Sequence, residues 1–414
     1  YRGKMSETSK LFSPIQMGDL SLKHRVVLAP LTRNRAGRTD LVASPLAQEY
    51  YAQRATDGGL LISEATLITS EGLLDNGIPG IWNEKQTASW KEIVDAVHAK
   101  GGLISCQLWH TGRAAHGSFK DHPAVTPGRE PTVGASAIAI PIATRSTLTG
   151  KKEPYNVPRP LRVDEVPRLL EDYKEAARNA KRAGFDAIEL HAAHGYLLDQ
   201  FLNDGTNQRT DEYGGSFENR ARLLFQVIEA LGTVYPYSRI AVRISPHHKG
   251  SLKYYATDDS DPVPLYSYVI EHLSKYKLAY LLLTEPRWSA RYDGDFSKDP
   301  GFSAPLVNPE KYRKLYTGGV VIGAGGFNPA GAKRAIEEGS YDAIGFGRWF
   351  ISNPDLVERI RNGAPFNKYN RKTFYSEGPH GYTDYPRYEE VEDKSVLVPQ
   401  KAIGATLDVT TSKA

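Results

Sequence analysis

The sequence predicts an α/β protein built as a single (β/α)8 TIM barrel. Short apolar runs alternate with longer amphipathic stretches along the 414 residues, and near-continuous apolar strands are typical of parallel sheets that are covered on both faces. Several of these runs end in polar or ring side chains, which is where such barrels place their chemistry. The chain is long for one barrel, but barrels with insertions can exceed about 400 residues.

The first half of the chain is expected to supply four strands and one long insertion. Apolar runs predict strands at residues 26–30, 59–67, 102–109 and 186–191. The intervening helices are expected at residues 44–54, 85–99 and 164–182. Trp90, Ile93 and Val97 share one face of the second helix, as residues three or four apart do. Residues 110–162 are rich in Pro, Gly and Thr, and because long loops are usually functional we expect a lid or cap here, inserted within the barrel.

The second half is expected to complete the barrel. Strands are predicted at residues 239–245, 279–284, 319–323 and 341–345, and helices at residues 217–231, 265–273, 329–338 and 354–362. Ser216 is an expected N-cap. The polar stretch after Arg387 is expected to lie over the barrel surface. We therefore predict one domain over residues 5–414, with residues 1–4 interpreted as an expression remnant and residues 412–414 as at most a weak targeting signal.

The composition excludes several classes of protein. The formal net charge of +4, from 52 Lys and Arg against 48 Asp and Glu, gives little reason to expect a nucleic-acid partner. No apolar run reaches membrane-spanning length. The single Cys106 excludes an intrachain disulfide framework and an iron–sulfur cluster held by cysteines. We expect a cytoplasmic protein, with monomer and homodimer both open.

Three ring side chains stand at the end of the fourth predicted strand or just after it, namely His191, His194 and Tyr196. Two imidazoles can hold one oxygen atom, and a phenol with an ordinary pKa of about 10 carries a proton at neutral pH. The pair could instead form half of a metal site, but zinc needs a third protein ligand. Cys106 and the sequence around it supply no obvious ligand, so no metal is expected.

Glycines follow the last two predicted strands. Gly325 and Gly326 come after the seventh strand, and Gly347 and Arg348 after the eighth. Glycines let the backbone approach a phosphate closely, and an arginine can fork onto its oxygens. The same glycines could simply make tight turns. Their position at adjacent strand ends, where barrels commonly bind phosphate, favours a phosphate site.

Further polar side chains stand in or after other predicted strands. Thr32 follows the first strand, Gln107 lies in the third and Arg243 in the fifth. Gln107 has donors and acceptors that suit the imide edge of a flavin, and Arg243 would place a fixed positive charge beside it. Alternatively, Thr32 caps a turn, Gln107 satisfies buried backbone and Arg243 pairs with a carboxylate such as Glu189. Cys106 should point away from Gln107 and be a packed thiol.

With these positions in hand, the chain resembles the old yellow enzyme family of flavin-dependent ene-reductases over nearly its whole length. The matching stretches are residues 29–35, 49–54, 107–113, 191–196, 209–216, 243–246, 345–352 and 373–375. The resemblance implies non-covalently bound FMN, NADPH or NADH as the reductant, and an electron-poor alkene as the substrate.

The resemblance also implies roles for single residues. The implied FMN contacts are Pro30, Thr32, Ala65, Gln107, Arg243, Gly325, Gly326, Gly347 and Arg348. His191 and His194 would hold the substrate's carbonyl or nitro oxygen, Tyr196 would protonate its α-carbon, and Trp109 and Tyr375 would line the pocket.

Two departures and two alternatives remain. Residues 247–255 and the tail after Arg387 differ from the commoner family pattern, which leaves the substrate and the choice between NADPH and NADH open. A non-redox barrel enzyme acting on a sugar phosphate would also use the glycine loops. A non-catalytic flavin-binding or redox-sensing protein would need neither Tyr196 nor the histidine pair.

Overall fold

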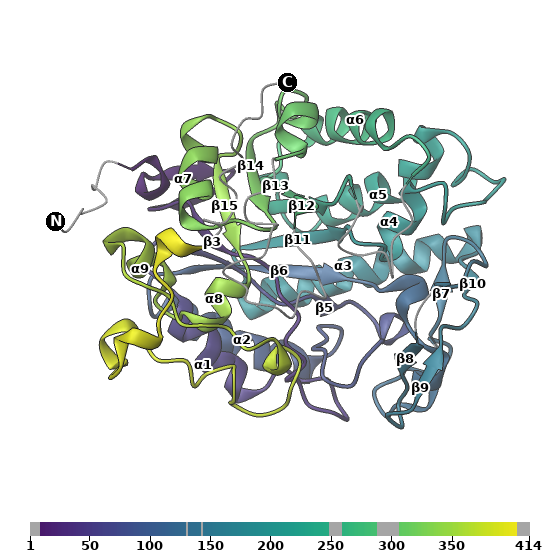
Figure 1. The fold of residues 1–414 in the computed structure, drawn as a ribbon. Helices are drawn as coiled ribbons and strands as arrows, with labels where there is room; N and C mark the ends of the chain where they lie inside the picture. Colours follow the sequence, from purple (N-terminus) through teal and green to yellow (C-terminus); the bar gives the residue numbers. More distant parts are fainter. Residues whose placement is uncertain (1–8, 130, 142–143, 248–258, 288–305, 404–414) are drawn as a thin grey trace, which may run out of the picture.

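A computed structural model describes residues 9–129, 131–141, 144–247, 259–287 and 306–403. Its centre is a closed barrel of eight parallel strands, which confirms the predicted fold (Figure 1). In barrel order the strands are β3 (Val26–Leu28), β4 (Leu60–Ile62), β6 (Leu103–Trp109), β11 (Ala187–Ala192), β12 (Ile240–Ile244), β13 (Tyr280–Thr284), β14 (Val320–Ala324) and β15 (Ala343–Phe346). Pairing of β15 with β3 closes the barrel.

Helices surround the barrel and follow its strands along the chain. The described α-helices are α1 (Pro45–Arg54), α2 (Glu84–His98), α3 (Val166–Ala183), α4 (Leu197–Leu202), α5 (Phe217–Gly232), α6 (Pro262–Leu273), α7 (Pro329–Glu337), α8 (Arg348–Ser352) and α9 (Leu356–Asn362). Trp90, Ile93 and Val97 are buried on α2, and Ser216 caps α5, as predicted. Helix α6 begins at Pro262, earlier than the expected residue 265. Proline suits the first turn of a helix, because the backbone N–H that it lacks would have no partner within the helix there.

The second predicted strand, residues 59–67, is wrong as one element. The structure has two short strands instead, β4 and β5 (Thr66–Leu67), and both pair with β6. Side-chain hydrogen bonds compete with the ladder between them. Ser63 Oγ accepts from the backbone N–H of Gln107 at 2.9 Å, and Glu64 Oε2 accepts from that of Arg33 at 3.0 Å.

A hairpin closes the end of the barrel where the strands begin. Its strands are β1 (Ile15–Met17) and β2 (Leu20–Leu22), and Met17, Leu20 and Leu22 pack into one buried cluster with barrel residues. Gly18 makes the turn with φ +54°, and a Cβ there would lie 2.0 Å from the carbonyl oxygen of Ser238. The hairpin therefore fills this end and leaves the opposite one for a site.

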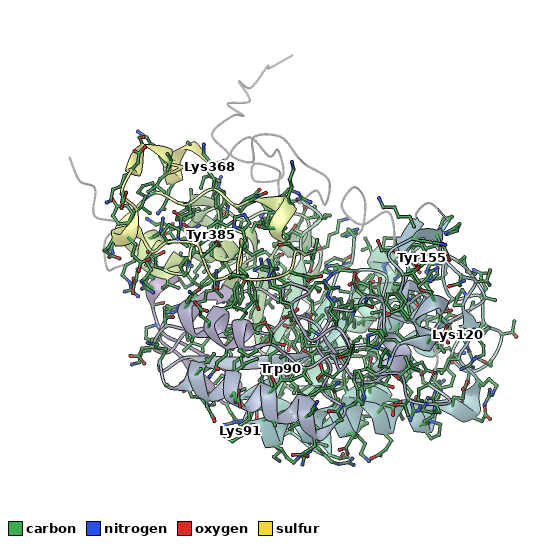
Figure 2. All side chains as sticks on the ribbon, turned by 90° about the horizontal axis from the view of Figure 1, so that it is seen from below. Trp90, Lys91, Lys120, Tyr155, Lys368 and Tyr385 are labelled. Carbon is green, nitrogen blue, oxygen red and sulfur yellow. The ribbon has the colours of Figure 1, made fainter. Side chains whose placement is uncertain are left out.

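The insertion, residues 110–162, lies to one side of the barrel (Figure 1). Its short strands are β7 (Val133–Gly134), β8 (Thr144–Ser146), β9 (Lys152–Pro154) and β10 (Arg159–Pro160). Arg209 Nη1 fastens the insertion by donating to the carbonyl oxygens of Ala135 and Leu161 at 2.9 and 2.6 Å. Its residues 130, 142 and 143 lie outside the described part. Figure 2 shows Lys120 and Tyr155 of the insertion far from Lys368 and Tyr385, which belong to the C-terminal segment, residues 363–403.

The polar stretch after Arg387 packs on the barrel's outer helices, as expected, as far as residue 403. Val398 forms a β-bridge with Phe366. Asn328 Nδ2 donates to the carbonyl oxygen of Ile403 at 2.8 Å, and Gln400 Nε2 to that of Arg359 at 2.7 Å. The expectations for residues 1–4, 248–255 and 412–414 lie outside the described residues. Within the described ranges, no helix combines the length and apolar character that a membrane crossing needs.

Candidate active site

A cavity of about 570 Å³ opens at the carboxyl ends of the barrel strands, a size typical of small-molecule sites. Every site residue expected from the sequence lines it: Pro30, Thr32, Ala65, Gln107, Trp109, His191, His194, Tyr196, Arg243, Gly325, Gly326, Gly347, Arg348 and Tyr375. They meet because parallel strands all end at the same edge of a barrel.

The three predicted ring side chains form one wall of the cavity together with Trp109. The ring centre of His191 lies 5.4 Å from that of His194 and 5.1 Å from that of Tyr196. The ring of Tyr196 meets that of Trp109 edge-on, with centres 4.7 Å apart. These contacts bring two imidazoles and a phenol to a common point in the cavity.

The turn that carries His194 is held by buried polar groups. His194 and Gly195 both have positive φ, 61° and 79°, so the chain reverses sharply after β11. Ser245 Oγ accepts from the N–H of His194 at 2.8 Å, and Asp199 Oδ2 from that of Gly195 at 2.7 Å. The hydroxyl of Tyr266 donates to the other Asp199 oxygen at 2.8 Å. Sequence reasoning missed Asp199 and Ser245, and the one available signal was an Asp in the first turn of a helix.

The environment of His191 favours its neutral form. Burial lowers the pKa of His191 well below 6.5, and the nearby positive charge of Arg243 lowers it further. Within the described structure the buried Nδ1 atom of His191 has no hydrogen-bond partner. A neutral imidazole still offers one N–H donor, so two adjacent rings can hold one oxygen without two adjacent positive charges.

Gln107 and Arg243 line the base of the cavity. Gln107 Nε2 donates to Glu189 Oε1 at 2.6 Å, and Arg243 Nε to Thr284 Oγ1 at 3.1 Å. Burial raises the pKa of Glu189 to about 7, although the charge of Arg243 opposes this rise. Glu189 therefore accepts a hydrogen bond from Gln107 and is stabilised in its ionised form by the charge of Arg243. The alternative that Gln107 satisfies a buried backbone group does not describe this contact, because its partner is the carboxyl group of Glu189.

The glycine loops after β14 and β15 also line the cavity. Gly325 and Gly326 have φ of 101° and 68°, values that glycine adopts without strain. A Cβ at Gly347 would lie 3.2 Å from Leu31 Cδ2. Arg348 is the first residue of α8 and also borders the cavity. Glycine backbone lets an anionic group approach closely, and the guanidinium of Arg348 beside it can bind such a group.

The mouth of the cavity is formed partly by the C-terminal segment. Tyr375 is 61% exposed there, next to the buried Phe374. Arg33 Nε donates to the carbonyl oxygen of Phe374 at 3.1 Å, and Arg35 Nη2 to that of Thr373 at 2.9 Å. These buried bonds fix the position of the segment relative to the barrel.

Sequence reasoning missed much of the remaining wall. The additional lining residues include Leu31, Leu74, Ile78, Phe327, Phe346, Trp349 and Arg371. Most are apolar side chains in or next to loops, which carry no chemical signal in a sequence. Cys106 is buried, and burial raises the pKa of its thiol to about 12, which agrees with a packed thiol. No group of three or more potential metal ligands occurs within the described ranges.

Comparisons with known proteins agree with this geometry. Residues 10–367 match the profile of the NADH:flavin oxidoreductase / NADH oxidase family. The chain is 45% identical to 12-oxophytodienoate reductase 7 of Oryza sativa subsp. japonica over 385 residues, which cover 91% of this chain and 94% of the relative. It is 41% identical to 12-oxophytodienoate reductase 2 of Arabidopsis thaliana over 383 residues, covering 92% and 96%.

Two solved structures resemble the whole barrel. Morphinone reductase, solved in complex with tetrahydroNAD, aligns with a TM-score of 0.80 at 41% identity and covers 92% of this chain and 99% of its own. The old yellow enzyme homologue of Zymomonas mobilis aligns with a TM-score of 0.80 at 40% identity, covering 91% and 99%.

Proposed function

Because the chain belongs to the NADH:flavin oxidoreductase / NADH oxidase family, which includes the old yellow enzymes, we propose that it reduces the C=C bond of electron-poor alkenes. It is an FMN-dependent, NAD(P)H-dependent oxidoreductase. The proposed substrates are α,β-unsaturated carbonyl compounds and nitroalkenes. The observation that carries the proposal is the meeting of His191, His194 and Tyr196 on one wall of the cavity. Neither a non-redox phosphosugar enzyme nor a non-catalytic flavin-binding protein agrees with this family.

The residues around the cavity fit FMN. The glycine loops and Arg348 offer a cradle for its phosphate, while Gln107 and Arg243 offer an amide and a positive charge to the imide edge of its ring. The residues proposed to contact FMN are Pro30, Thr32, Ala65, Gln107, Arg243, Gly325, Gly326, Gly347 and Arg348. When bound, FMN would supply hydride chemistry, which lets a hydride from NADPH or NADH pass to the alkene.

His191 and His194 are proposed to hold the oxygen atom of the substrate. Negative charge builds up on that oxygen when the β-carbon is reduced, so donors aimed at it stabilise the transition state more than the ground state. By the precedent of oxyanion holes, each donor is worth about 3 kcal/mol. The neutral form favoured for His191 suits this role, because it leaves an N–H donor without a second charge in the cavity.

Tyr196 is proposed to deliver the proton to the α-carbon. Its ring meets those of Trp109 and His191 edge-on, with centres 4.7 and 5.1 Å away, and these two rings lie 6.0 Å from each other. Packing against both rings fixes the orientation of Tyr196. Trp109 and Tyr375 are proposed to line the substrate pocket. The 12-oxophytodienoate reductases and morphinone reductase support reduction of this general kind.

Analysis of labelled products tests the reaction. The protein is incubated without oxygen with one enone or nitroalkene and either NADPH or NADH deuterated at C4, first in water and then with unlabelled cofactor in D₂O. We expect deuterium at the β-carbon in the first case and at the α-carbon in the second. Reduction of the flavin by NAD(P)H that leaves the alkene unchanged would contradict the proposal. The oligomeric state and the cellular compartment stay predictions.

A further inference from the structure

Glu189 is a buried ionisable residue for which the reaction proposed above has no use. It lies on β11 two residues before His191, has no solvent exposure, and is not among the residues that line the cavity. Its register partner on β6 is Gln107, which does line the cavity. Glu189 thus stands directly behind a residue of the cavity wall.

The groups around Glu189 come from each neighbouring strand. Gln107 Nε2, on β6, donates to Glu189 Oε1 at 2.6 Å. Arg243, on β12, favours the ionised carboxylate by its charge. Tyr280, on β13, is also close, and its hydroxyl donates to Ser105 Oγ at 3.2 Å. Within the described part of the chain, Arg243 and Tyr280 are the titratable groups that act on the pKa of Glu189.

An ionised carboxylate accepts hydrogen bonds and donates none. A carboxylate behind Gln107 therefore requires the NH₂ group of the amide to point toward it and leaves the amide oxygen for the cavity side. The cavity wall then presents an acceptor at Gln107 beside the donor groups of Arg243. This pattern complements an imide edge, in which one N–H lies between two carbonyl groups.

We propose that Glu189 is a positioning residue that orients the amide of Gln107, so that its oxygen faces the cavity and accepts from the imide N–H of the flavin. The inference rests on the proposed function, specifically on the placing of that ring edge at Gln107 and Arg243. Neutral Glu189 can donate a hydrogen bond itself and allows the amide to reverse. Because burial raises the pKa of Glu189 to about 7, this reversal becomes available as the pH falls below neutrality.

A double-mutant cycle on FMN affinity tests the inference. Dissociation of FMN from diluted holoenzyme is followed by recovery of flavin fluorescence in the wild type, Glu189→Gln, Gln107→Ala and the double variant. Glu189→Gln should raise the dissociation constant about tenfold, as expected for one buried hydrogen bond. In the Gln107→Ala background the same change should have less than about a twofold effect, because the amide it orients is gone.

A second buried glutamate provides the control. Glu71 is 1% exposed and accepts from Arg168 Nη2 at 3.1 Å, but it does not line the cavity. Glu71→Gln should leave FMN affinity unchanged. The inference would be overturned if Glu189→Gln weakened FMN binding equally with and without the Gln107 amide. It would also be overturned if Glu71→Gln weakened FMN binding as much as Glu189→Gln does.

A measurement on the wild type covers the case in which Glu189→Gln does not fold. FMN is compared with N3-methyl-FMN, which has the same phosphate but no imide N–H. The preference for FMN should be several-fold greater at pH 8 than at pH 6, and titration of the phosphate cancels in the ratio. A preference that does not change with pH would overturn the inference. These experiments measure FMN binding, so a negative result would contradict the role of Glu189 without contradicting alkene reduction. A negative result of the labelled-product experiment would contradict alkene reduction without contradicting the role of Glu189.

Discussion

The backbone N–H of His194 donates to the hydroxyl of Ser245 at 2.8 Å, which joins the turn after β11 to the end of β12. His194 has φ +61°, a left-handed conformation that costs roughly 1–2 kcal/mol for a residue with a side chain. This hydrogen bond offsets part of that cost. The position of the imidazole in the cavity therefore depends on a residue of the next strand.

We predict that Ser245→Ala raises the KM for enones about fivefold and leaves the FMN content unchanged. Loss of a buried hydrogen bond costs about 1 kcal/mol, and here the lost bond orients a proposed substrate ligand. Steady-state kinetics and the flavin-to-protein absorbance ratio measure the two effects. Ser216→Ala, which removes the N-cap of α5, should lower stability by about 1 kcal/mol without changing KM. If Ser245→Ala has no effect on KM, the turn does not position His194 for substrate.

Arg348→Ala should emerge from purification largely as apoprotein. A charge-assisted hydrogen bond contributes about 1.5–3 kcal/mol, so losing the contact with the phosphate should weaken FMN binding at least tenfold. The absorbance ratio after extensive dialysis measures the flavin that is retained. Arg182→Ala serves as the control, because Arg182 pairs with Glu84 at the surface. Full flavin in dialysed Arg348→Ala would show that the phosphate lies elsewhere.

The barrel and the polar residues that line its cavity could be predicted from the sequence for one physical reason. Polar residues at the ends of parallel strands must converge, so the sequence alone predicts that Gln107, His191 and Arg243 share one site. The break between β4 and β5 could not be foreseen, because Ser63 and Glu64 replace the ladder by bonds to Gln107 and Arg33, which are distant in sequence.

The stability of the fold should depend on pH through His24. Burial lowers the pKa of His24 from 6.5 to about 4, with a smaller contribution from the charge of Arg361. The unfolded chain therefore binds a proton between these values that the folded chain does not, and stability falls as the pH falls through this window. At pH 5 the expected loss relative to pH 8 is about 2 kcal/mol from this residue.

Urea unfolding of the FMN-loaded protein at pH 5 and pH 8 measures this effect. His24→Gln loses the contact with Thr56 Oγ1, which lies 2.8 Å from Nε2, and should be less stable at pH 8. Its difference in stability between the two pH values should nevertheless be smaller than that of the wild type by about 2 kcal/mol. An equal difference in both proteins would mean that His24 is protonated in the folded state or titrates alike in both states.

The histidine pair should bind the oxygen atom of an enone, and likewise that of a phenol, without a metal. Because no third ligand is present near the pair in the described structure, dialysed active protein should contain no stoichiometric zinc by elemental analysis. Replacing His191 and His194 together by alanine should weaken phenol binding at least tenfold while FMN remains bound, as measured by perturbation of the flavin spectrum. Stoichiometric zinc, with activity lost to a chelator, would contradict the proposed role as oxygen ligands.

The final prediction separates the two half-reactions by means of Tyr196. Reduction of the protein by a nicotinamide requires no proton from this residue, whereas reduction of an enone requires a proton at the α-carbon. A positioned acid contributes about 10² to 10⁴ in rate. Tyr196→Phe keeps the ring that packs against Trp109 and His191 and removes only the acid. We therefore expect near-normal reduction by NADPH and reoxidation by an enone that is slower by a factor in that range.

A nitroalkene provides the internal control for this variant, because its nitronate product is a stabilised anion that can leave before it is protonated. Reoxidation of Tyr196→Phe by a nitroalkene should therefore be slowed much less than reoxidation by an enone. Rapid-mixing absorbance traces of the wild type and the variant, with one substrate of each kind, measure all three rates. Equal slowing of both half-reactions would mean that Tyr196 shapes the pocket and does not donate the proton. Unchanged reoxidation by the enone would assign the proton to water or to another group, since the phenol is then dispensable.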